Sequence, residues 1–504
     1  MGDKNLEHIL SSTSSLLFDQ IEQKKVIFII SNSTVDGIIS SSIIFDSIYR
    51  MGGNAVIRCE DSGNYEESKY RIGNLIKEGY DSFILLDFDS NFYDEIVDLI
   101  THNNYFLFIN ADKDSSKSKN SIETDKVRYL NTYKIKDILN LDNAPTISSV
   151  VYYLIKDIDR KITQMSYLPL IAEISKFSNA IYDRPNEPYN EILQTAMSLN
   201  LIEKKKDLVF VGKPTSSIIS VLEDNTSYFI KGLTWNRQAS IKVLQRSGVL
   251  SAENKRAKSL DELEEREINE IVNSIEEFVE KENSNDDDTT LVSKNLREKL
   301  LSYNYVLTSE ESNSILKGSY SFAKALESCI KRKSIGLALA ISLGDRYDLL
   351  NEIRDQIQSD KFKIRKSGSR IFSEKWRCYE DGKITFVNGE GILDEKQIVE
   401  FADLLAKSHS FSDKIICLRT TGTSSEEMYK YILMSGESIK LDAVKLREKI
   451  KEFTEKQGLS IKYCSPTRYY NDRKNINIEV IVPVNKLEVF LSNIKKIILD
   501  VNTP

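Results

Sequence analysis

The sequence predicts an α/β protein: a parallel sheet with flanking helices, a mostly helical middle region, and a second α/β domain at the C-terminus. Between residues 24 and 180, continuous apolar runs alternate with amphipathic stretches, which is typical of parallel strands covered by helices on both faces. The 504 residues exceed what one hydrophobic core usually organises. We therefore expect three parts, at residues 1–200, 201–360 and 361–504.

The first part alternates strand-like and helix-like segments. The strand-like runs are KVIFII (25–30), NAVIRC (54–59), SFILLDF (82–88) and YFLFIN (105–110). Helix-like stretches lie between them and after them: SSSIIFDSIYRMG (40–52), YEESKYRIGNLIKEG (65–79) and most of 146–204. Sites in such sheets form beyond the carboxyl ends of the strands.

The middle region begins with DLVFVGKPTSSIISVLED (207–224), which predicts a short strand and then a helix that Pro214 and Thr215 start. An acidic amphipathic helix follows within 258–288, either as a solvated face or as a docking site for a basic partner. Two packed helices are expected within 319–359. KFKIRKSGSRIFSEKWRCYEDGKITFVNG (361–389) then predicts strands with turns at Gly368 and Gly382.

Charge and composition exclude several classes of protein. A net charge of -7 and a pI near 5.5 argue against coating nucleic acid by bulk electrostatics, so any such contact needs a local patch. The five cysteines have no C-x-x-C spacing, which favours a reducing compartment over a zinc ribbon or disulfide framework. Neither a signal-like N-terminus nor a bilayer-length apolar run is present. We expect a cytoplasmic protein.

The segment SNSTVDGIISSSIIF (31–45) follows the first apolar run and looks like the turn of a metal site. Acidic residues come directly after apolar runs at Asp36, Asp87 and either Asp89 or Asp112. Carboxylates at neighbouring strand ends are how α/β phosphoesterases hold two Mn²⁺ or Mg²⁺ ions. Asp also favours turns after strands for purely structural reasons, so spacing alone leaves both interpretations open.

These segments resemble, in order, the motifs of the DHH phosphoesterase superfamily, in particular its archaeal RecJ-like branch. SNSTVDGIISSSII is similar to the first motif, FILLDFDS to the second, LFINADKD to the D-H-H motif and NAPTISSVVYYLI to the E-I-S-G-A-G-V-A-Y helix. Later segments extend the resemblance to nearly the whole chain: IEKKKDLVFVGKPTSSIISVL, IKGLTWN, FAKALESCIKRKSIGLALAISLGD, GEGILDEKQIVEFADLLAKS and IICLRTTG. The resemblance implies a DHH-type domain and a C-terminal DHHA1-like domain.

The ligand positions that the resemblance implies are mostly lost. The first motif's His and first Asp fall on Asn32 and Thr34, whereas its second Asp is kept as Asp36, and the second motif's Asp is kept as Asp87. The D-H-H motif reads Asn110, Ala111 and Asp112, and a later family Asp falls on Asn179. Two closely spaced divalent cations need more than two carboxylates. We therefore expect no catalytic residues, no bound metal or other cofactor, and no nuclease activity.

The C-terminal domain departs from the family as well. The glycine-rich G-G-G-H turn reads KQGLSIKYCSPTRYY, where only Gly458 remains. Arg419, in CLRTTG, falls where the family's substrate-facing strand carries an Arg, which implies a phosphate contact. A surface charge on an edge strand is an equally open interpretation.

A local nucleic-acid patch is predicted within 361–377, where cations alternate with aromatic rings. The alternative is an amphipathic strand between domains with its charges in water. The candidate binding residues, which include the Arg of the C-terminal domain, are Lys363, Arg365, Lys366, Arg370, Trp376, Arg377 and Arg419.

Loss of the ligands with retention of the fold resembles the inactive RecJ relatives that act with GINS and the MCM ring in the CMG replicative helicase. The resemblance implies GINS and MCM as partners, with single-stranded DNA as a third candidate. Two alternatives stay open: a weakened single-strand 5′–3′ exonuclease that keeps one Mn²⁺ or Mg²⁺ on Asp36 and Asp87, and a free-standing DNA- or RNA-binding protein.

Overall fold

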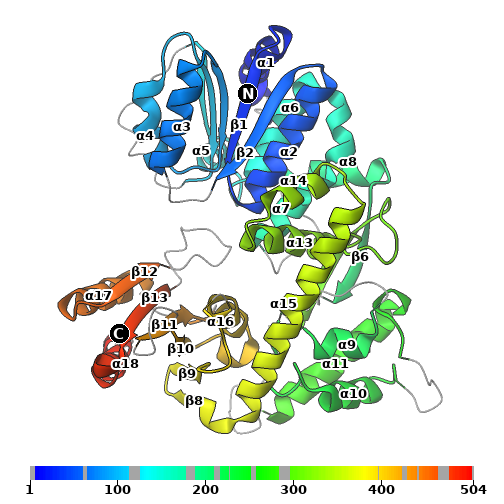
Figure 1. Cartoon of the computed structure of the whole chain (residues 1–504). Coiled ribbons are helices and arrows are strands. Elements are labelled where there is room, and N and C mark those ends of the chain that lie inside the picture. The colour runs from blue at the N-terminus through cyan, green and yellow to red at the C-terminus, as the bar shows by residue number, and fades with distance from the viewer. Residues whose placement is uncertain are drawn as a thin grey trace. The chain divides into compact units, whose positions relative to one another are not determined.

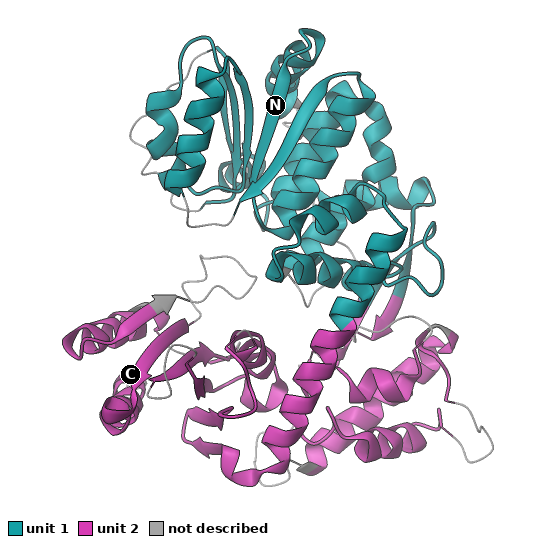
Figure 2. Ribbon diagram, viewed as in Figure 1, with its two compact units in different colours: residues 1–205, 303–357 teal, residues 206–302, 358–504 magenta. Residues whose placement is uncertain are grey.

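The computed structural model describes most of the chain, namely residues 6–60, 65–112, 125–177, 188–208, 216–225, 228–250, 257–282, 296–395, 397–422, 428–436, 438–439, 442–463 and 476–501. The chain forms two compact units, one of residues 1–205 with 303–357 and one of residues 206–302 with 358–504 (Figure 2). The predicted division into three parts stays a prediction, because compactness does not test which parts fold by themselves.

A parallel sheet organises the first unit (Figure 1). Its five strands run in the order β2-β1-β3-β4-β5, and every neighbouring pair is parallel. All side chains of the central strands β3 and β4 are buried, as continuous apolar runs predict for a sheet covered on both faces. The sequence predicts the first four of these strands but not the fifth: β1 Val26–Asn32, β2 Asn54–Glu60, β3 Ser82–Leu86, β4 Tyr105–Asn110 and β5 Val127–Asn131.

Helices cover this sheet and extend the unit. The predicted helices at 40–52 and 65–79 are α2 and α3, and the predicted pair within 319–359 is confirmed as α13 and α14. The helices of the unit are α1 Leu6–Glu22, α2 Val35–Arg50, α3 Tyr65–Lys77, α4 Ser90–Ile96, α5 Thr132–Leu139, α6 Ile147–Ile158, α7 Tyr167–Phe177, α8 Tyr189–Ser198, α13 Ser319–Lys331 and α14 Ile335–Ser342.

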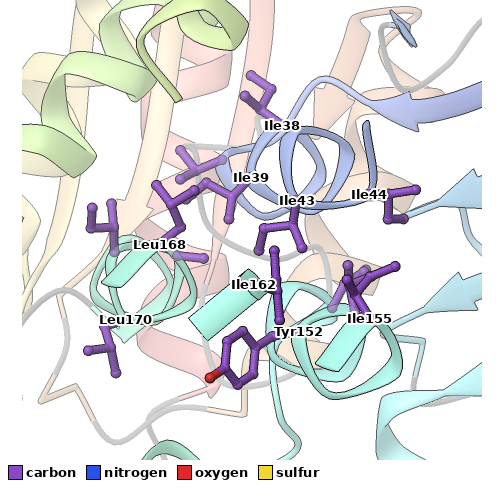
Figure 3. Packing of buried hydrophobic residues seen from close by; sticks show 14 of the residues in the cluster. Ile38, Ile39, Ile43, Ile44, Tyr152, Ile155, Ile162, Leu168 and Leu170 are labelled. Atoms are coloured by element: carbon purple, nitrogen blue, oxygen red, sulfur yellow. The ribbon is translucent and has the colours of Figure 1, made fainter. Parts of the chain in front are cut away.

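Helix α2 lies in the centre of the main core, packed against β1, β2, α6 and α7. Figure 3 shows its isoleucines, among them Ile39 and Ile43, beside Tyr152 and Ile155 of α6 and Leu168 of α7. The small residues Ser40–Ser42 of α2 are fully buried too, so neighbouring helices approach closely. This packing fixes the N-terminus of α2 at the carboxyl end of β1.

The second unit contains a mixed sheet with helices on both faces. Its six strands run in the order β12-β13-β11-β10-β9-β8; β9 and β10 are parallel, and the other neighbours are antiparallel. The strands are β8 Cys378–Asp381, β9 Ile384–Asn388, β10 Ile415–Thr421, β11 Met428–Ser435, β12 Ser460–Tyr463 and β13 Asn477–Pro483. The helices are α9 Ile218–Glu223, α10 Arg237–Arg246, α11 Glu265–Glu282, α16 Ile398–Ala406, α17 Ala443–Lys456 and α18 Leu487–Val501.

Three elements, α15, β6 and β7, belong to both units. Helix α15, Asp348–Ser373, begins in the first unit and ends in the second, and β6 Ile202–Leu208 forms a two-stranded sheet with β7 Leu301–Leu307. The predicted fold class is confirmed: a parallel five-stranded sheet, a helical middle and a C-terminal mixed sheet. No helix among the described residues has the length and apolarity that crossing a lipid bilayer requires.

One segment was predicted wrongly. Residues 361–373 are the last turns of α15 and not a strand, and Gly368 lies inside that helix. The ring of Trp235 packs directly against Gly368, and a Cβ at this position would lie 2.2 Å from the ring. Glycine is unfavourable in a helix interior, but here it is the residue that leaves room for this contact. The turn at Gly382 is confirmed by its φ of 58°, between β8 and β9. Pro214 and Thr215 lie outside the described residues, and the helix after them begins at Ile218.

Candidate functional site

Asp36 lies at the start of α2, directly beyond the end of β1. The turn is tight, because a Cβ on Gly37 would lie 2.4 Å from the carbonyl oxygen of Asn32. The carboxylate is 3% exposed and accepts two backbone hydrogen bonds, from the amide of Ile147 to Oδ2 and from the amide of Ser148 to Oδ1, each 2.8 Å long. Asp36 thus supplies a charged acceptor to the otherwise unpaired amides at the N-terminus of α6.

Asp87 follows β3 in a left-handed backbone conformation, with a φ of 64°. Its Oδ2 accepts a hydrogen bond from Thr34 Oγ1 at 2.5 Å, and its carbonyl oxygen accepts one from Asn32 Nδ2 at 3.3 Å. The pKa of Asp87 is raised to about 7, mainly by burial and also by the charge of Asp36, while the Thr34 hydrogen bond and Lys176 oppose the shift. The Thr34 hydroxyl and the Asn32 amide, both neutral, thus stand at the two positions where the resemblance implies metal ligands.

Asn110 is the last residue of β4 and Asp112 follows the strand, and both are held by polar groups of neighbouring segments. Asn110 Nδ2 donates to the Tyr129 hydroxyl at 2.6 Å, and Asn110 Oδ1 accepts from Asn131 Nδ2 at 2.8 Å. Asp112 Oδ2 accepts from the Ser90 hydroxyl at 2.7 Å and from the Ser90 amide at 3.2 Å. These bonds tie the ends of β4 and β5 to the start of α4.

The remaining motif positions are Ala111 and Asn179. Ala111 is partly buried and packs against the main hydrophobic core, and Asn179 lies outside the described residues. Asp89 accepts hydrogen bonds from the amide of Phe92 and the hydroxyl of Tyr65, at 3.1 and 2.7 Å, and thereby caps α4. The carboxylate that spacing alone left as a candidate ligand therefore has a structural role.

A two-metal centre does not fit these residues. In the described part of the chain, no three His, Cys, Asp or Glu side chains are grouped so that they could hold a metal ion. Both oxygens of Asp36 accept backbone amides, and Asp87, with its pKa of about 7, carries only part of a negative charge at neutral pH. Neutral amides and hydroxyls cannot offset two divalent charges.

Sequence reasoning missed several members of this polar network. Tyr129 and Asn131 belong to the short strand β5, which the apolar pattern did not reveal. Glu173 and Lys176 come from α7; burial raises the pKa of Glu173 to about 8, and Lys176 opposes that shift. Lys176 also favours the charged form of Asp87, so one ammonium group acts on both carboxyls. The sequence signal that could have revealed them is the charged pair Glu173 and Lys176 within the otherwise apolar sequence of α7.

Arg419 lies on β10, where its donors are already used inside the protein. Nε donates to Asn388 Oδ1 and Nη2 donates to Glu390 Oε2, each at 3.1 Å. Its guanidinium also lies 5.1 Å from the centre of the Tyr429 ring. The predicted phosphate contact stays a prediction, and a phosphate would have to compete with Glu390 for this side chain.

The predicted nucleic-acid residues divide into internal and exposed groups. Arg365 forms ion pairs with Glu223 and Asp224, and Arg377 is 7% exposed and bonds to Glu374 and to the carbonyl oxygens of Asn388 and Glu390. On the solvent side of α15 and just beyond its end lie Lys363, Lys366, Arg370 and Trp376.

Comparison with known proteins places the chain by its fold. No family model matches the sequence, and no curated protein is significantly similar to it. The structure is similar to that of CDC45 from Entamoeba histolytica, with a TM-score of 0.63 and 12% identity over 97% of this chain and 99% of that one.

Two manganese-bound RecJ structures are similar as well. RecJ from Thermus thermophilus has a TM-score of 0.51 at 10% identity over 98% of this chain, which matches 55% of the RecJ chain. An exonuclease RecJ has a TM-score of 0.50 at 10% identity, over 98% of this chain and 94% of that one. The chain therefore has a fold similar to those of CDC45 and RecJ over nearly its full length.

Proposed function

We propose that this chain is a catalytically inactive RecJ-like scaffold of DNA replication that associates with GINS and the MCM helicase in a CMG-type complex. The fold that it shares with CDC45 supports this role, and so does the resemblance of its degenerate motifs to the inactive RecJ relatives. The proposal includes a cytoplasmic location.

The observation that carries the proposal is the way in which the polar groups at the strand ends are used. Asp36 caps α6, Asp87 accepts from Thr34, and Asn110 joins Tyr129 to Asn131. Hydrolysis with two metal ions needs carboxylates free to bridge the ions and orient a water. Here the same positions connect β1, β3, β4, β5 and α6, so they serve the fold on which a partner would dock.

Affinity capture tests the partner assignment. The tagged full-length chain is recovered from its native cells at moderate salt with nuclease treatment, and bound proteins are identified by mass spectrometry. We expect GINS and MCM subunits. Recovery of neither, from cells in which both are present, would contradict the scaffold proposal and favour an independent role in nucleic-acid processing.

A weakened single-strand exonuclease is the second candidate. The likeness to manganese-bound RecJ and the retention of Asp36 and Asp87 favour it. The test is digestion of 5′-labelled single-stranded DNA with Mn²⁺, comparing the wild type with Asp87→Asn. We expect no cleavage by either protein. Robust cleavage by the wild type that Asp87→Asn abolishes would establish the exonuclease instead.

A further inference from the structure

We propose that single-stranded nucleic acid binds along the solvent face of α15 from residue 358 to 373 and stacks on the adjoining Trp376. The inference deepens the proposed function, and it rests on that function in taking nucleic acid as the ligand class. The surface differs from the site at the ends of the parallel strands, because it belongs entirely to the second unit.

The solvent face of this segment carries positive charge and no exposed acid. Its exposed residues are Gln358, Ser359, Phe362, Lys363, Lys366, Ser369, Arg370, Ser373, Lys375 and Trp376. The two acidic residues of the segment, Asp360 and Glu374, are only partly exposed, and Glu374 binds Arg370 and Arg377. In a chain of net charge -7, such a face is a local exception of the kind that phosphate binding requires.

The helical geometry brings these cations together. Lys363, Lys366 and Arg370 are three and four residues apart, so they lie on one side of the helix within about 11 Å along its axis. Lys363 and Lys366 form no ion pair with any described residue, so both ammonium groups are available to phosphates. The opposite side of the helix is buried through Ile364 and Ile371, which keeps the charged side toward solvent.

The ring of Trp376 is exposed to solvent, and the side chain of Arg377 packs against it. The Trp376 side chain is 62% exposed, while the guanidinium of Arg377 lies 4.2 Å from the ring centre. Arg377 is itself fixed by Glu374 at 2.6 Å and by the carbonyl oxygen of Glu390 at 2.9 Å. The indole is therefore both exposed and preorganised, as a stacking platform for a base needs to be.

The combination of charge and aromatic rings favours a single strand over other ligands. Phe362, 65% exposed, lies on α15 beside Lys363, and Trp376 lies just beyond the end of the same helix, so an exposed ring stands near each end of the basic face. Duplexes keep their base faces stacked, so exposed rings would have no partner there. An acidic protein segment would form ion pairs with the cations, but it has no nucleobase that could stack on the indole of Trp376.

The test measures binding of full-length protein to a fluorescein-labelled oligothymidylate of about 20 nucleotides by anisotropy. Lys363→Glu with Lys366→Glu is expected to weaken binding at least tenfold at about 0.1 M salt and to lower the salt slope by about 1.4. The matched control reverses two exposed lysines on α17 and α18, Lys445→Glu with Lys496→Glu, and is expected to change the affinity less than threefold.

Trp376 supplies a second readout that charge cannot mimic. Trp376→Ala is expected to weaken binding roughly tenfold with an unchanged salt slope, and the oligonucleotide is expected to quench tryptophan emission in the wild type but not in this variant. The other tryptophan, Trp235, is 8% exposed and serves as an internal reference.

Three results would overturn the inference: an equal loss of affinity in the control pair, binding without quenching, or an oligoglutamate peptide that displaces the oligonucleotide and binds more tightly. The last would assign the face to an acidic protein segment. Capture of GINS and MCM is measured separately, so failure of this surface and failure of the scaffold proposal are distinguishable.

Discussion

Asp36→Ala is expected to destabilise the protein by about 3 kcal/mol, although the resemblance implies only a former metal ligand at this position. The substitution removes both acceptors from the amides of Ile147 and Ser148, whose residues are fully buried at the N-terminus of α6. Water cannot replace the carboxylate there without opening the core around α2 and α6. Chemical denaturation followed by circular dichroism measures the loss.

Asp89→Ala is the matched control, because Asp89 also caps a helix after a strand of the same sheet. Its carboxylate is partly exposed and accepts one backbone amide and the Tyr65 hydroxyl, so we expect a loss of about 1 kcal/mol. If Asp36→Ala were as mild as Asp89→Ala, the cap would be unimportant and retention of Asp36 would need another explanation.

Asp87→Asn is expected to have the opposite effect and to stabilise the protein at neutral and alkaline pH. The pKa of Asp87 is about 7 in the folded chain, against an ordinary value of 3.8, so the folded state holds a proton that the unfolded state has released. The contribution of Asp87 to the free energy of unfolding is therefore fully present below about pH 4 and is lost as the pH rises through about 7. The free energy of unfolding falls by at most about 4 kcal/mol over this pH range. Asparagine does not ionise, so the variant has no such loss.

The substitution is conservative in every other respect. Asparagine tolerates the φ of 64° at this position, and its Oδ1 can still accept the Thr34 hydroxyl. We expect the two proteins to be equally stable near pH 4 and the variant to be more stable by about 2 kcal/mol at pH 8. Subtracting the curves removes other titrating groups, Glu173 included. A variant that is less stable than the wild type at pH 8 would show that the Asp87 carboxylate is needed in its charged form.

Much of the first sheet follows from local sequence, because its central strands are buried on both faces and form continuous apolar runs. β5 escapes that pattern, since Arg128 and Tyr129 interrupt a strand of five residues. The sequence at the end of α15 predicts a strand because Phe362 and Ile364 alternate with cations and Gly368 suggests a turn. Only the tertiary contact with Trp235 explains that glycine, and no local pattern contains it.

The candidate site, too, could be predicted from the sequence only in part. The loss of ligands at Asn32, Thr34, Asn110 and Ala111 is legible in the sequence once the motifs are aligned by resemblance. The structural role of Asp36 cannot be read from the sequence, because Ile147, whose amide donates a hydrogen bond to it, lies 111 residues away. A carboxylate can be retained after catalysis is lost when the fold depends on its hydrogen bonds, and sequence alone does not separate these two reasons for retention.

Together these contacts form a structural connection at the carboxyl ends of the strands. Neutral side chains now link the strand ends, and the remaining carboxylates are a helix cap and a group that is half protonated near neutral pH. These contacts hold the sheet and its covering helices together, as the proposed scaffold role requires of this part of the fold.

Titration of the full-length protein with Mn²⁺ by isothermal calorimetry, at about pH 7.5 and beside Asp87→Asn, tests most directly whether the strand ends have lost their metal site. We expect no saturable binding in the wild type and the same trace in the variant. Stoichiometric Mn²⁺ binding by the wild type that Asp87→Asn abolishes would contradict this expectation, because the strand ends would then hold a metal site in use.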